Sequence, residues 1–567
     1  MSSFLDTSSK DEVKKIDQAL AKAVYAGGLP FSVFENNPFF SDAFKLMRPS
    51  YPRPPSALRL STSLLNAEFA TASCSTDEKI KKALCLSIIA DGLTNCRSEG
   101  IINYLVGTPE IVFYGVDEPG DEKEDSEYIS RKMCEKIRDL GSTRVLLAIT
   151  DNAPVMQAAW ERIKVEFPHI FFLGCVAHGL NLLVKDIMKT VPLARLNKLV
   201  VECIKSFKRQ RVNAAVFRSK QEKIDGSKPS KSLRLPANTR FAAAAISFES
   251  LERNKTALQE AVLDEKVEVT SEVRANILDN QGFWKEVSYA RKLLEPIAKG
   301  IRFLEGDYPS LSFVPRVMMD IKQKITEVLP LTSFSDSVRK TILADLRYRI
   351  NFCCKDLHKC AYLLNPMFRG AGLTDDEFAD CSVVIASIAD HLNLDKDDVL
   401  KNLTEYRSKE GIFSRDVLWD AAKKSICNPC QWWQAFCASQ PLRPIAERLL
   451  QFPSTSCSCE RLWSDYDFVH NKRRNRLQNV KVKKTVYVRK HLQKSRAKKK
   501  SLTKVPSVKK TNPIVQYYMD VQPVPLDENL GRNDDEYVDL WDDDGEEDNC
   551  SDSDYAPSSD NEEDDDY

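Results

Sequence analysis

Long apolar runs are missing from this chain of 567 residues. No uninterrupted apolar stretch approaches the roughly 18 residues that a membrane-spanning helix needs, which argues against a membrane protein. The 16 cysteines follow no regular spacing, and no signal peptide is recognisable. Because disulfide frameworks belong to exported proteins, this cysteine usage indicates a reducing compartment.

A zinc-finger spacing is also missing from the N-terminal part of the chain. No Cys-x2-Cys followed by paired histidines precedes residue 91, where the only cysteines are Cys74 and Cys85. A short pair further on, Cys427 and Cys430, has no second pair at metal-binding distance. We expect that pair to form a turn before a helix.

Net charge is absent as well, but only because charges of opposite sign are segregated. Residues 533–567 hold 18 acids and no Lys or Arg, which leaves 64 acidic residues against 82 basic ones in the rest of the chain, a net charge of +18. Residues 472–510 hold 17 Lys and Arg without an acid. A basic body with an acidic tail is typical of a polyanion binder whose tail competes for the same surface.

The end of the chain is too polar to bury a core. We therefore expect a basic, proline-containing linker over residues 496–533 and a disordered acidic tail over residues 534–567. The run Lys498-Lys499-Lys500 is a candidate nuclear-import signal and favours the nucleus as the location.

Between residues 83 and 187 the hydrophobic period changes repeatedly. The patterns predict five strands and three helices in the order β-β-β-α-β-α-β-α, which indicates a mixed sheet flanked by helices. The predicted strands cover residues 85–90, 101–106, 110–116, 144–149 and 170–173, and the helices cover 125–139, 150–166 and 175–188.

The remaining segments are predicted to be mainly helical, so the fold class is α/β plus α. Residues 191–448 alternate apolar stripes of helical period with polar loops, and we interpret them as a helical insertion that interrupts the sheet domain. The predicted parts are an N-terminal helical region at 1–75, the sheet domain at 76–190, the insertion at 191–448 and the last part of the sheet domain at 449–495.

Three acids stand where a short apolar run gives way to a turn or a helix: Asp91, Asp151 and Glu460. Since strand ends carry the sites of open α/β sheets, the two aspartates are expected to lie close together. Carboxylates that converge on two Mg2+ ions are the ligands of a two-metal nuclease site. The simpler readings are a strand-to-turn aspartate, a helix N-cap and a helix-face acid paired with Arg461.

Several short motifs between residues 10 and 495 form a specific combination. They are Asp91-Gly92-Leu93-Thr94, Leu147-Ala148-Ile149-Thr150-Asp151-Asn152-Ala153, Pro168-His169-Ile170-Phe171, Cys175-Val176-Ala177-His178, Asn238-Thr239-Arg240-Phe241, His358 to Pro366, Ser456 to Ser464 and Lys472 to Leu477. Together they resemble the hAT-superfamily transposases, which have an RNase H-like catalytic domain and a C-terminal dimerisation region.

The resemblance implies a role for nine residues. Asp91, Asp151 and Glu460 would be the catalytic acids that bind Mg2+ or Mn2+. The resemblance places Cys175 and His178 beside the active site in a structural or supporting role, although both could be ordinary residues at a helix start. The implied DNA contacts are Arg240, Phe241, Arg474 and Arg476.

The chain departs from the family pattern in three ways. Leu93 and Phe241 each stand where the family usually has Trp, and Phe offers a base a smaller stacking face. The zinc finger of the BED type that opens many hAT transposases is not found before residue 91. If the chain is complete, this places sequence-specific recognition of DNA ends in doubt.

These observations predict a nuclear, transposase-derived protein that binds DNA, forms a homodimer or larger homo-oligomer, and cleaves and transfers DNA strands with an Asp-Asp-Glu site. The alternative is a domesticated, non-catalytic, dimeric DNA- or chromatin-binding protein that keeps the transposase fold. A third reading is a fragment of a live element whose finger is encoded upstream. An unrelated α/β enzyme would require several motifs to coincide by chance.

Overall fold

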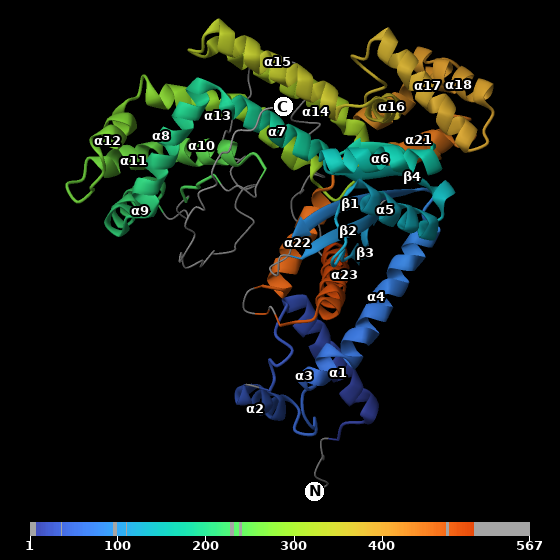
Figure 1. Cartoon of the computed structure of the whole chain (residues 1–567), viewed down its shortest axis with the longest axis horizontal. Coiled ribbons are helices and arrows are strands. Elements are labelled where there is room, and N and C mark those ends of the chain that lie inside the picture. The colour runs from blue at the N-terminus through green and yellow to red at the C-terminus, as the bar shows by residue number, and fades with distance from the viewer. Residues whose placement is uncertain are drawn as a thin grey trace. The chain divides into compact units, whose positions relative to one another are not determined.

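The computed structural model describes residues 7–503, apart from 36, 95–98, 109, 227–231, 237–240, 472, 473 and 475 (Figure 1). The predicted tail at 534–567 and most of the predicted linker lie outside these residues. Among the helices of the described part, none is long and apolar enough to cross a membrane.

A five-stranded mixed sheet forms the centre of the α/β part. Its strands are β1 (Leu86–Thr94), β2 (Gly100–Gly107), β3 (Ile111–Asp117), β4 (Val145–Thr150) and β5 (Phe171–Gly174), in the spatial order β3-β2-β1-β4-β5. The first three strands are antiparallel neighbours, whereas β4 pairs parallel with β1 and β5 pairs parallel with β4. Parallel neighbours need a crossover, and α5 (Ser126–Leu140) and α6 (Pro154–Glu166) supply the two crossovers.

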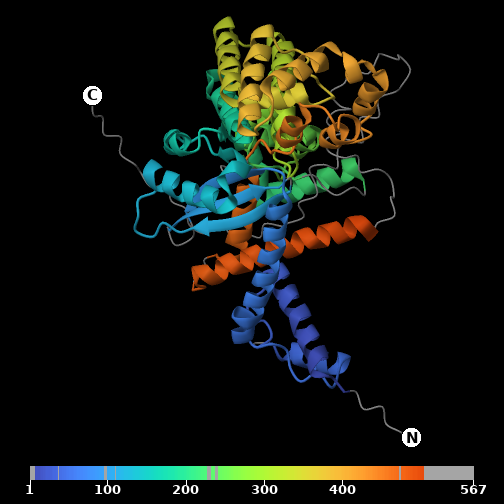
Figure 2. The same cartoon turned by 90° about the vertical axis from the view of Figure 1, so that its right-hand side faces the viewer.

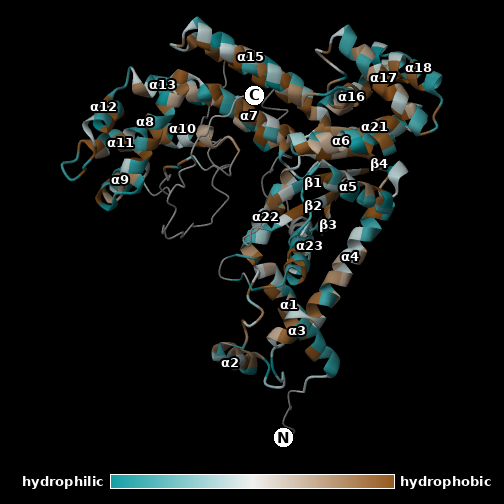
Figure 3. Ribbon diagram, in the orientation of Figure 1, coloured by the Kyte–Doolittle hydropathy of each residue, from teal (hydrophilic) through white to brown (hydrophobic). Residues whose placement is uncertain are grey.

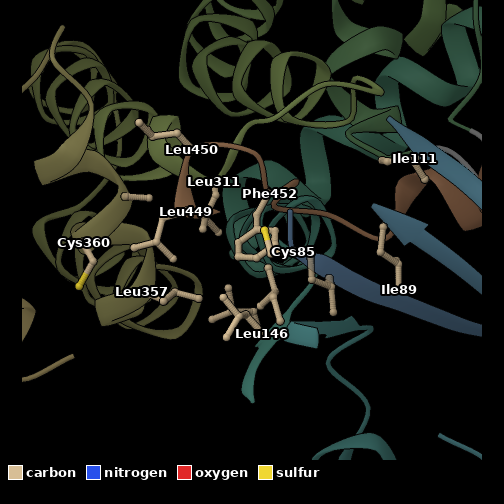
Figure 4. Close-up of a cluster of buried hydrophobic side chains, with 14 of the residues drawn as sticks. Cys85, Ile89, Ile111, Leu146, Leu311, Leu357, Cys360, Leu449, Leu450 and Phe452 are labelled. Atoms are coloured by element: carbon tan, nitrogen blue, oxygen red, sulfur yellow. The ribbon is translucent and has the colours of Figure 1, made fainter. Parts of the chain in front are cut away.

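Side chains that alternate along the strands contribute to two separate cores. Leu86, Ile88 and Ala90 of β1 pack with residues of α5 and α6 on one face. Ile89 faces the other way and joins a larger cluster with the helical segments that come after the sheet in the chain. Figure 4 shows this second cluster, where Cys85, Ile89, Ile111 and Leu146 meet residues from 311 to 452.

The segment from residue 176 to 452 is helical throughout its regular elements, as the sequence predicts. Its helices carry alternating apolar and polar residues (Figure 3). They are α7 (Val176–Lys189), α8 (Val191–Lys208), α9 (Arg211–Asp225), α10 (Ala243–Arg253), α11 (Lys255–Val262), α12 (Ser271–Leu278), α13 (Phe283–Leu304), η2 (Leu311–Phe313), α14 (Val314–Val328), η3 (Leu329–Leu331), α15 (Asp336–Cys353), α16 (Asp356–Leu364), α17 (Asp375–His391), α18 (Lys396–Ser408), η4 (Gly411–Ser414), α19 (Asp416–Lys423), α20 (Pro429–Phe436) and α21 (Arg443–Leu449).

Two helices at the C-terminal end return the chain to the sheet. α22 (Cys457–Val469) packs against β1 and β2, and α23 (Asn479–Thr503) packs against β3 and lies beside the N-terminal helices (Figure 2). Those N-terminal helices are α1 (Lys10–Gly27), α2 (Pro38–Met47), α3 (Ala57–Ser61) and α4 (Ser63–Lys82). The return is fixed at its start, because the backbone N–H groups of Ser310 and Leu311 both donate to the carbonyl of Phe452.

The predicted order of strands and helices from residue 83 to 189 is confirmed, with a short 3-10 turn, η1 (Ser142–Arg144), before β4. The turn that we expected at Cys427 and Cys430 is confirmed for Cys427, which precedes the N-cap Asn428, whereas Cys430 already lies in the first turn of α20. α4 continues to Lys82, across the predicted division between residues 75 and 76, and α23 extends past residue 495 into the predicted linker. Lys and Arg are good helix formers, so a basic sequence does not stop a helix.

Candidate active site

Asp91 lies inside β1 rather than at the strand's end, where the sequence placed it. β1 continues to Thr94 because β2 pairs with it along its whole length, and Asp91 stands opposite Asn103 in that pairing. The Asp91 side chain is on the face that α22 covers, and Trp463 Nε1 of α22 donates a hydrogen bond to Asp91 Oδ2 at 2.9 Å. A neighbouring helix therefore holds this carboxylate in place.

Asp151 immediately follows β4. Its Oδ1 accepts a hydrogen bond from the backbone N–H of Ala153 at 3.1 Å, and Ala153 is the N-cap of α6. Asp151 thus turns the chain into the helix without being the N-cap itself. Because Ile149 pairs with Ile89, Asp151 and Asp91 are at the same level of the neighbouring strands.

Glu460 lies in the first turn of α22. The simple reading, an ion pair with Arg461, is wrong, because Arg461 points elsewhere and pairs with Asp307 while also donating to the carbonyl of Glu305. In the part of the chain that the structure describes, no Lys, Arg or His forms an ion pair with the Glu460 carboxylate. This acid is half-buried, and the charge of Arg461 acts on it without forming an ion pair.

Burial and mutual repulsion raise two of the carboxyl pKa values. Burial raises the pKa of Asp91 to about 6, the Trp463 hydrogen bond opposes the rise, and the charge of Asp151 adds to it. Burial raises the pKa of Glu460 to about 8, with further contributions from Cys175, Asp91 and Glu305. Asp91 is therefore within electrostatic range of both Asp151 and Glu460, while the charge of Arg461 opposes the rise at Glu460.

The donor set of this region matches what Mg2+ prefers. Among the described residues, no three His, Cys, Asp or Glu side chains are already close enough together to hold one ion. Mg2+, however, is usually bound in proteins by one or two carboxylates, with water and phosphate oxygens completing its shell. Two neighbouring aspartates and a nearby glutamate without basic partners fit such a cation.

Cys175 connects the loop after β4 to the start of α22. It is fully buried at the N-cap of α7, where Asn152 Nδ2 donates to its carbonyl at 3.0 Å. The backbone N–H of Ser456 donates to Cys175 Sγ at 3.3 Å. Although burial opposes it, hydrogen bonds from Cys457 and Ser456 lower the pKa of Cys175. These contacts suit the supporting role that the sequence predicts.

His178 lies one turn further along α7. Its ring meets the ring of Phe241 edge to face, with the centroids 6.4 Å apart. Burial lowers the pKa of His178, against the opposing charge of Asp151. His178 and Phe241 thus lie on the Asp151 side of the site.

The other predicted DNA contacts have different outcomes. Arg240 lies outside the described residues. Arg474 donates a hydrogen bond to the carbonyl of Gly28, so it connects the segment after α22 to the end of α1, while Arg476 is exposed. Neither arginine is shown beside the three acids, and their role in DNA binding stays a prediction.

Two side chains near the acids were not predicted as functional. The sequence placed Trp463 on the same helix face as Glu460, but its bond to Asp91 depends on contact between residues 372 positions apart. Asn103 was read as part of an apolar strand. The only signal for it in the sequence is a polar residue in the middle of the run Ile101 to Val106.

Comparison with known families covers both parts of this site. Residues 55–209 match the domain of unknown function DUF659, which includes Asp91, Asp151 and the pair Cys175 and His178. Residues 402–492 match the hAT family C-terminal dimerisation region, which includes Glu460. None of the curated proteins matches the chain. The two family matches, in this order along one chain, support an hAT-family transposase.

Proposed function

We propose that this protein is a transposase-derived nuclease that cleaves and transfers DNA strands with Asp91, Asp151 and Glu460, and that its sheet domain is RNase H-like. The observation that supports the proposal is the placement of Asp91 and Asp151 at the same level of neighbouring strands, beneath a helix from about 300 residues later that carries Glu460, with no described Lys, Arg or His forming an ion pair with Glu460. Uncompensated charge of this kind destabilises a fold, so it needs a functional reason.

The sheet supports the proposed RNase H-like fold. Three antiparallel strands are followed by two parallel ones, with β1 in the centre next to β4. This order brings Asp91 and Asp151 to adjacent strands. α22, which follows the helical segment in the sequence, packs on β1 and β2 and carries Glu460.

The cations proposed here are Mg2+ or Mn2+, held by Asp91 and Asp151 with Glu460 completing the site. Bound cations of this type activate the attacking oxygen and stabilise charge on the leaving oxygen. The chain's own contribution is orientation. Trp463 fixes one oxygen of Asp91, and the Ala153 N–H fixes one oxygen of Asp151.

Burial raises the pKa of Glu460 to about 8 without a cation, and a divalent cation bound beside it would favour the ionised form that can accept a proton. In the proposed reaction a Glu460 oxygen accepts the proton that the attacking water loses. The water oxygen bonds to phosphorus, the bond from phosphorus to the 3′ oxygen breaks, and the leaving 3′ oxygen takes a proton from solvent, which gives a 3′-hydroxyl and a 5′-phosphate. That hydroxyl then loses its proton to solvent as its oxygen bonds to a phosphorus of a second strand, and the displaced 3′ oxygen of that strand takes a proton from solvent.

DNA is the proposed substrate and the nucleus the proposed location. Support for DNA comes from the family, from the body's net charge of +18 and from the 17 basic residues at 472–510. The match to a dimerisation region indicates a homo-oligomer. Residues Lys498 to Lys500 support import into the nucleus.

One observation favours the alternative, a non-catalytic DNA- or chromatin-binding protein that keeps the transposase fold. Within the described residues the three acids do not form a ready cluster for a single ion. A repurposed protein would keep the fold and the dimerisation region while the site loosens. The experiment below separates the two functions.

The test is nicking of supercoiled plasmid by the purified full chain in Mn2+. We expect metal-dependent nicking that falls at least about 100-fold in Asp151→Ala and in Glu460→Gln. The first variant removes a proposed ligand of the cation, and the second removes the proposed proton acceptor. Glu410→Gln, which neutralises an exposed acid elsewhere, is the matched control and should nick like the wild type. Equal activity in all four proteins, or none in the wild type while it still binds DNA, would favour the non-catalytic alternative.

A further inference from the structure

Asn103 is a buried polar residue whose presence the packing of the sheet does not explain. Its side chain is fully buried in β2, and neither Nδ2 nor Oδ1 has a hydrogen-bond partner. Its neighbours on the same face, Ile101 and Leu105, are apolar and belong to the larger core. Because an unpaired amide destabilises a core, a leucine here would suit the fold better.

The position of Asn103 connects it to the acids. In the antiparallel pairing of β1 and β2, Asn103 stands directly opposite Asp91. Both side chains are on the face that α22 covers, since Ile89 and Leu105 beside them pack with Leu462 and Trp463 of that helix. Cross-strand neighbours have Cβ atoms about 5 Å apart, which is within reach of an amide and a carboxylate.

The order of the strands decides which role Asn103 can have. β2 and β4 flank β1 on opposite sides, so Asn103 and Asp151 are on opposite sides of Asp91. Asn103 is therefore not placed between the two aspartates, where a shared cation would be. It lies on the side of Asp91 away from Asp151, where its amide can contact the Asp91 carboxylate but not that of Asp151.

We propose that Asn103 is a positioning residue for Asp91. Its side-chain N–H group donates to the ionised Asp91 carboxylate when a divalent cation binds between Asp91 and Asp151. This inference rests on the proposed function. With Trp463 already donating to Oδ2, a second donor would fix the direction in which Asp91 presents its oxygens. Partners behind a metal-binding carboxylate typically change metal affinity about 10- to 100-fold when they are removed.

The test compares Mn2+ affinity and thermal stability in Asn103→Leu. Leucine is similar in size and removes only the amide. We expect an unchanged or higher melting temperature, together with Mn2+ binding that is at least about tenfold weaker, measured on the full chain by electron paramagnetic resonance of free Mn2+. Asn103→Val, which suits a strand and has no donor group, should show the same weakening and provides the test if the leucine variant does not fold.

Ser87→Ala is the matched control. Ser87 lies on the same face of β1, is fully buried and also has an unpartnered side-chain oxygen, but it is four residues from Asp91, about 13 Å along the strand. It should bind Mn2+ like the wild type. Wild-type affinity in the Asn103 variants would overturn the inference and leave the proposed function intact. A wild-type chain that binds no Mn2+ would overturn both.

Discussion

At the scale of single residues, the candidate site consists of buried carboxylates and the neighbouring groups that orient them. Burial and the charge of Asp151 oppose the ionisation of Asp91, whereas hydrogen bonds from the Trp463 indole and the Gly92 backbone favour it. Glu460 has no ion-pair partner among the described residues, because its neighbour Arg461 is engaged by Asp307. The residues around the site orient the acids without neutralising them.

The raised pKa of Asp91 predicts how stability depends on pH when no divalent cation is present. A carboxyl whose pKa is about 6 in the folded chain and 3.8 when unfolded favours folding in its protonated form. Stability is therefore lost as the pH rises from about 4 through 6. Asp91→Asn cannot ionise, so at pH 8 it should be more stable than the wild type by up to about 3 kcal/mol, and by less at pH 5.

Thermal unfolding in a chelator at pH 5 and pH 8 measures this difference. Glu410→Gln serves as the control, because it removes an exposed acid and should show no such pH dependence. A difference between Asp91→Asn and the wild type that is the same at both pH values would contradict the burial of Asp91 described above.

At the scale of elements, α22 is the helix on which the site depends. It carries Glu460 and Trp463, and it is held from three directions: by β1 and β2, by Asp307 through Arg461, and by α23. The contact with α23 is an ion pair between Asp465 and Arg489 at 3.0 Å, in which both side chains are nearly buried. Arg489 also donates to the carbonyl of Ala26 at the end of α1.

Asp465→Ala should destabilise this junction strongly. It leaves the Arg489 guanidinium, which is 13% exposed, without its counter-charge, and loss of one partner of a buried pair typically costs about 3–5 kcal/mol. Chemical denaturation of the full chain measures the loss. Glu327→Ala removes one partner of an exposed pair with Lys324 and should cost less than about 1 kcal/mol. Similar losses in the two variants would show that the Asp465 contact is not buried in solution.

At the scale of the whole molecule, the distribution of charge is the dominant feature. The chain is neutral only because 18 acids at residues 533–567 offset the basic remainder. The dimerisation region indicates that at least two such chains associate, which doubles both the basic surface and the number of tails. We therefore expect the tail to compete with any polyanion that the basic part of the chain binds.

A chain that ends at Arg532 should bind duplex DNA more tightly than the full chain. We expect an affinity about tenfold higher at low salt. The difference should shrink as salt is raised, because screening weakens the attraction of the basic residues to both the tail and the DNA. Fluorescence anisotropy of a labelled duplex over a salt series measures it. The control is a full chain whose tail acids are replaced by Asn and Gln, which should behave like the shortened one. Equal affinities at every salt concentration would show that the tail does not compete.

The sequence by itself determined the order of the elements around the sheet. Alternating and β-branched runs specify strands, and local capping specifies helices such as α5, so these features need only neighbouring residues. The three acids could also be proposed from sequence, because their motifs are short and contiguous. Family models match the two segments that contain these acids, whereas the catalytic role of the acids stays a proposal.

Only the tertiary structure decided what surrounds each acid. Asp91 is inside its strand because β2 pairs past it, Trp463 reaches it from 372 residues away, and Arg461 leaves Glu460 for Asp307. The proposed role of Asn103 depends on its pairing opposite Asp91, which the sequence does not reveal. The physical reason is that pairing and packing between distant segments choose each side chain's partners, and no local pattern contains those choices.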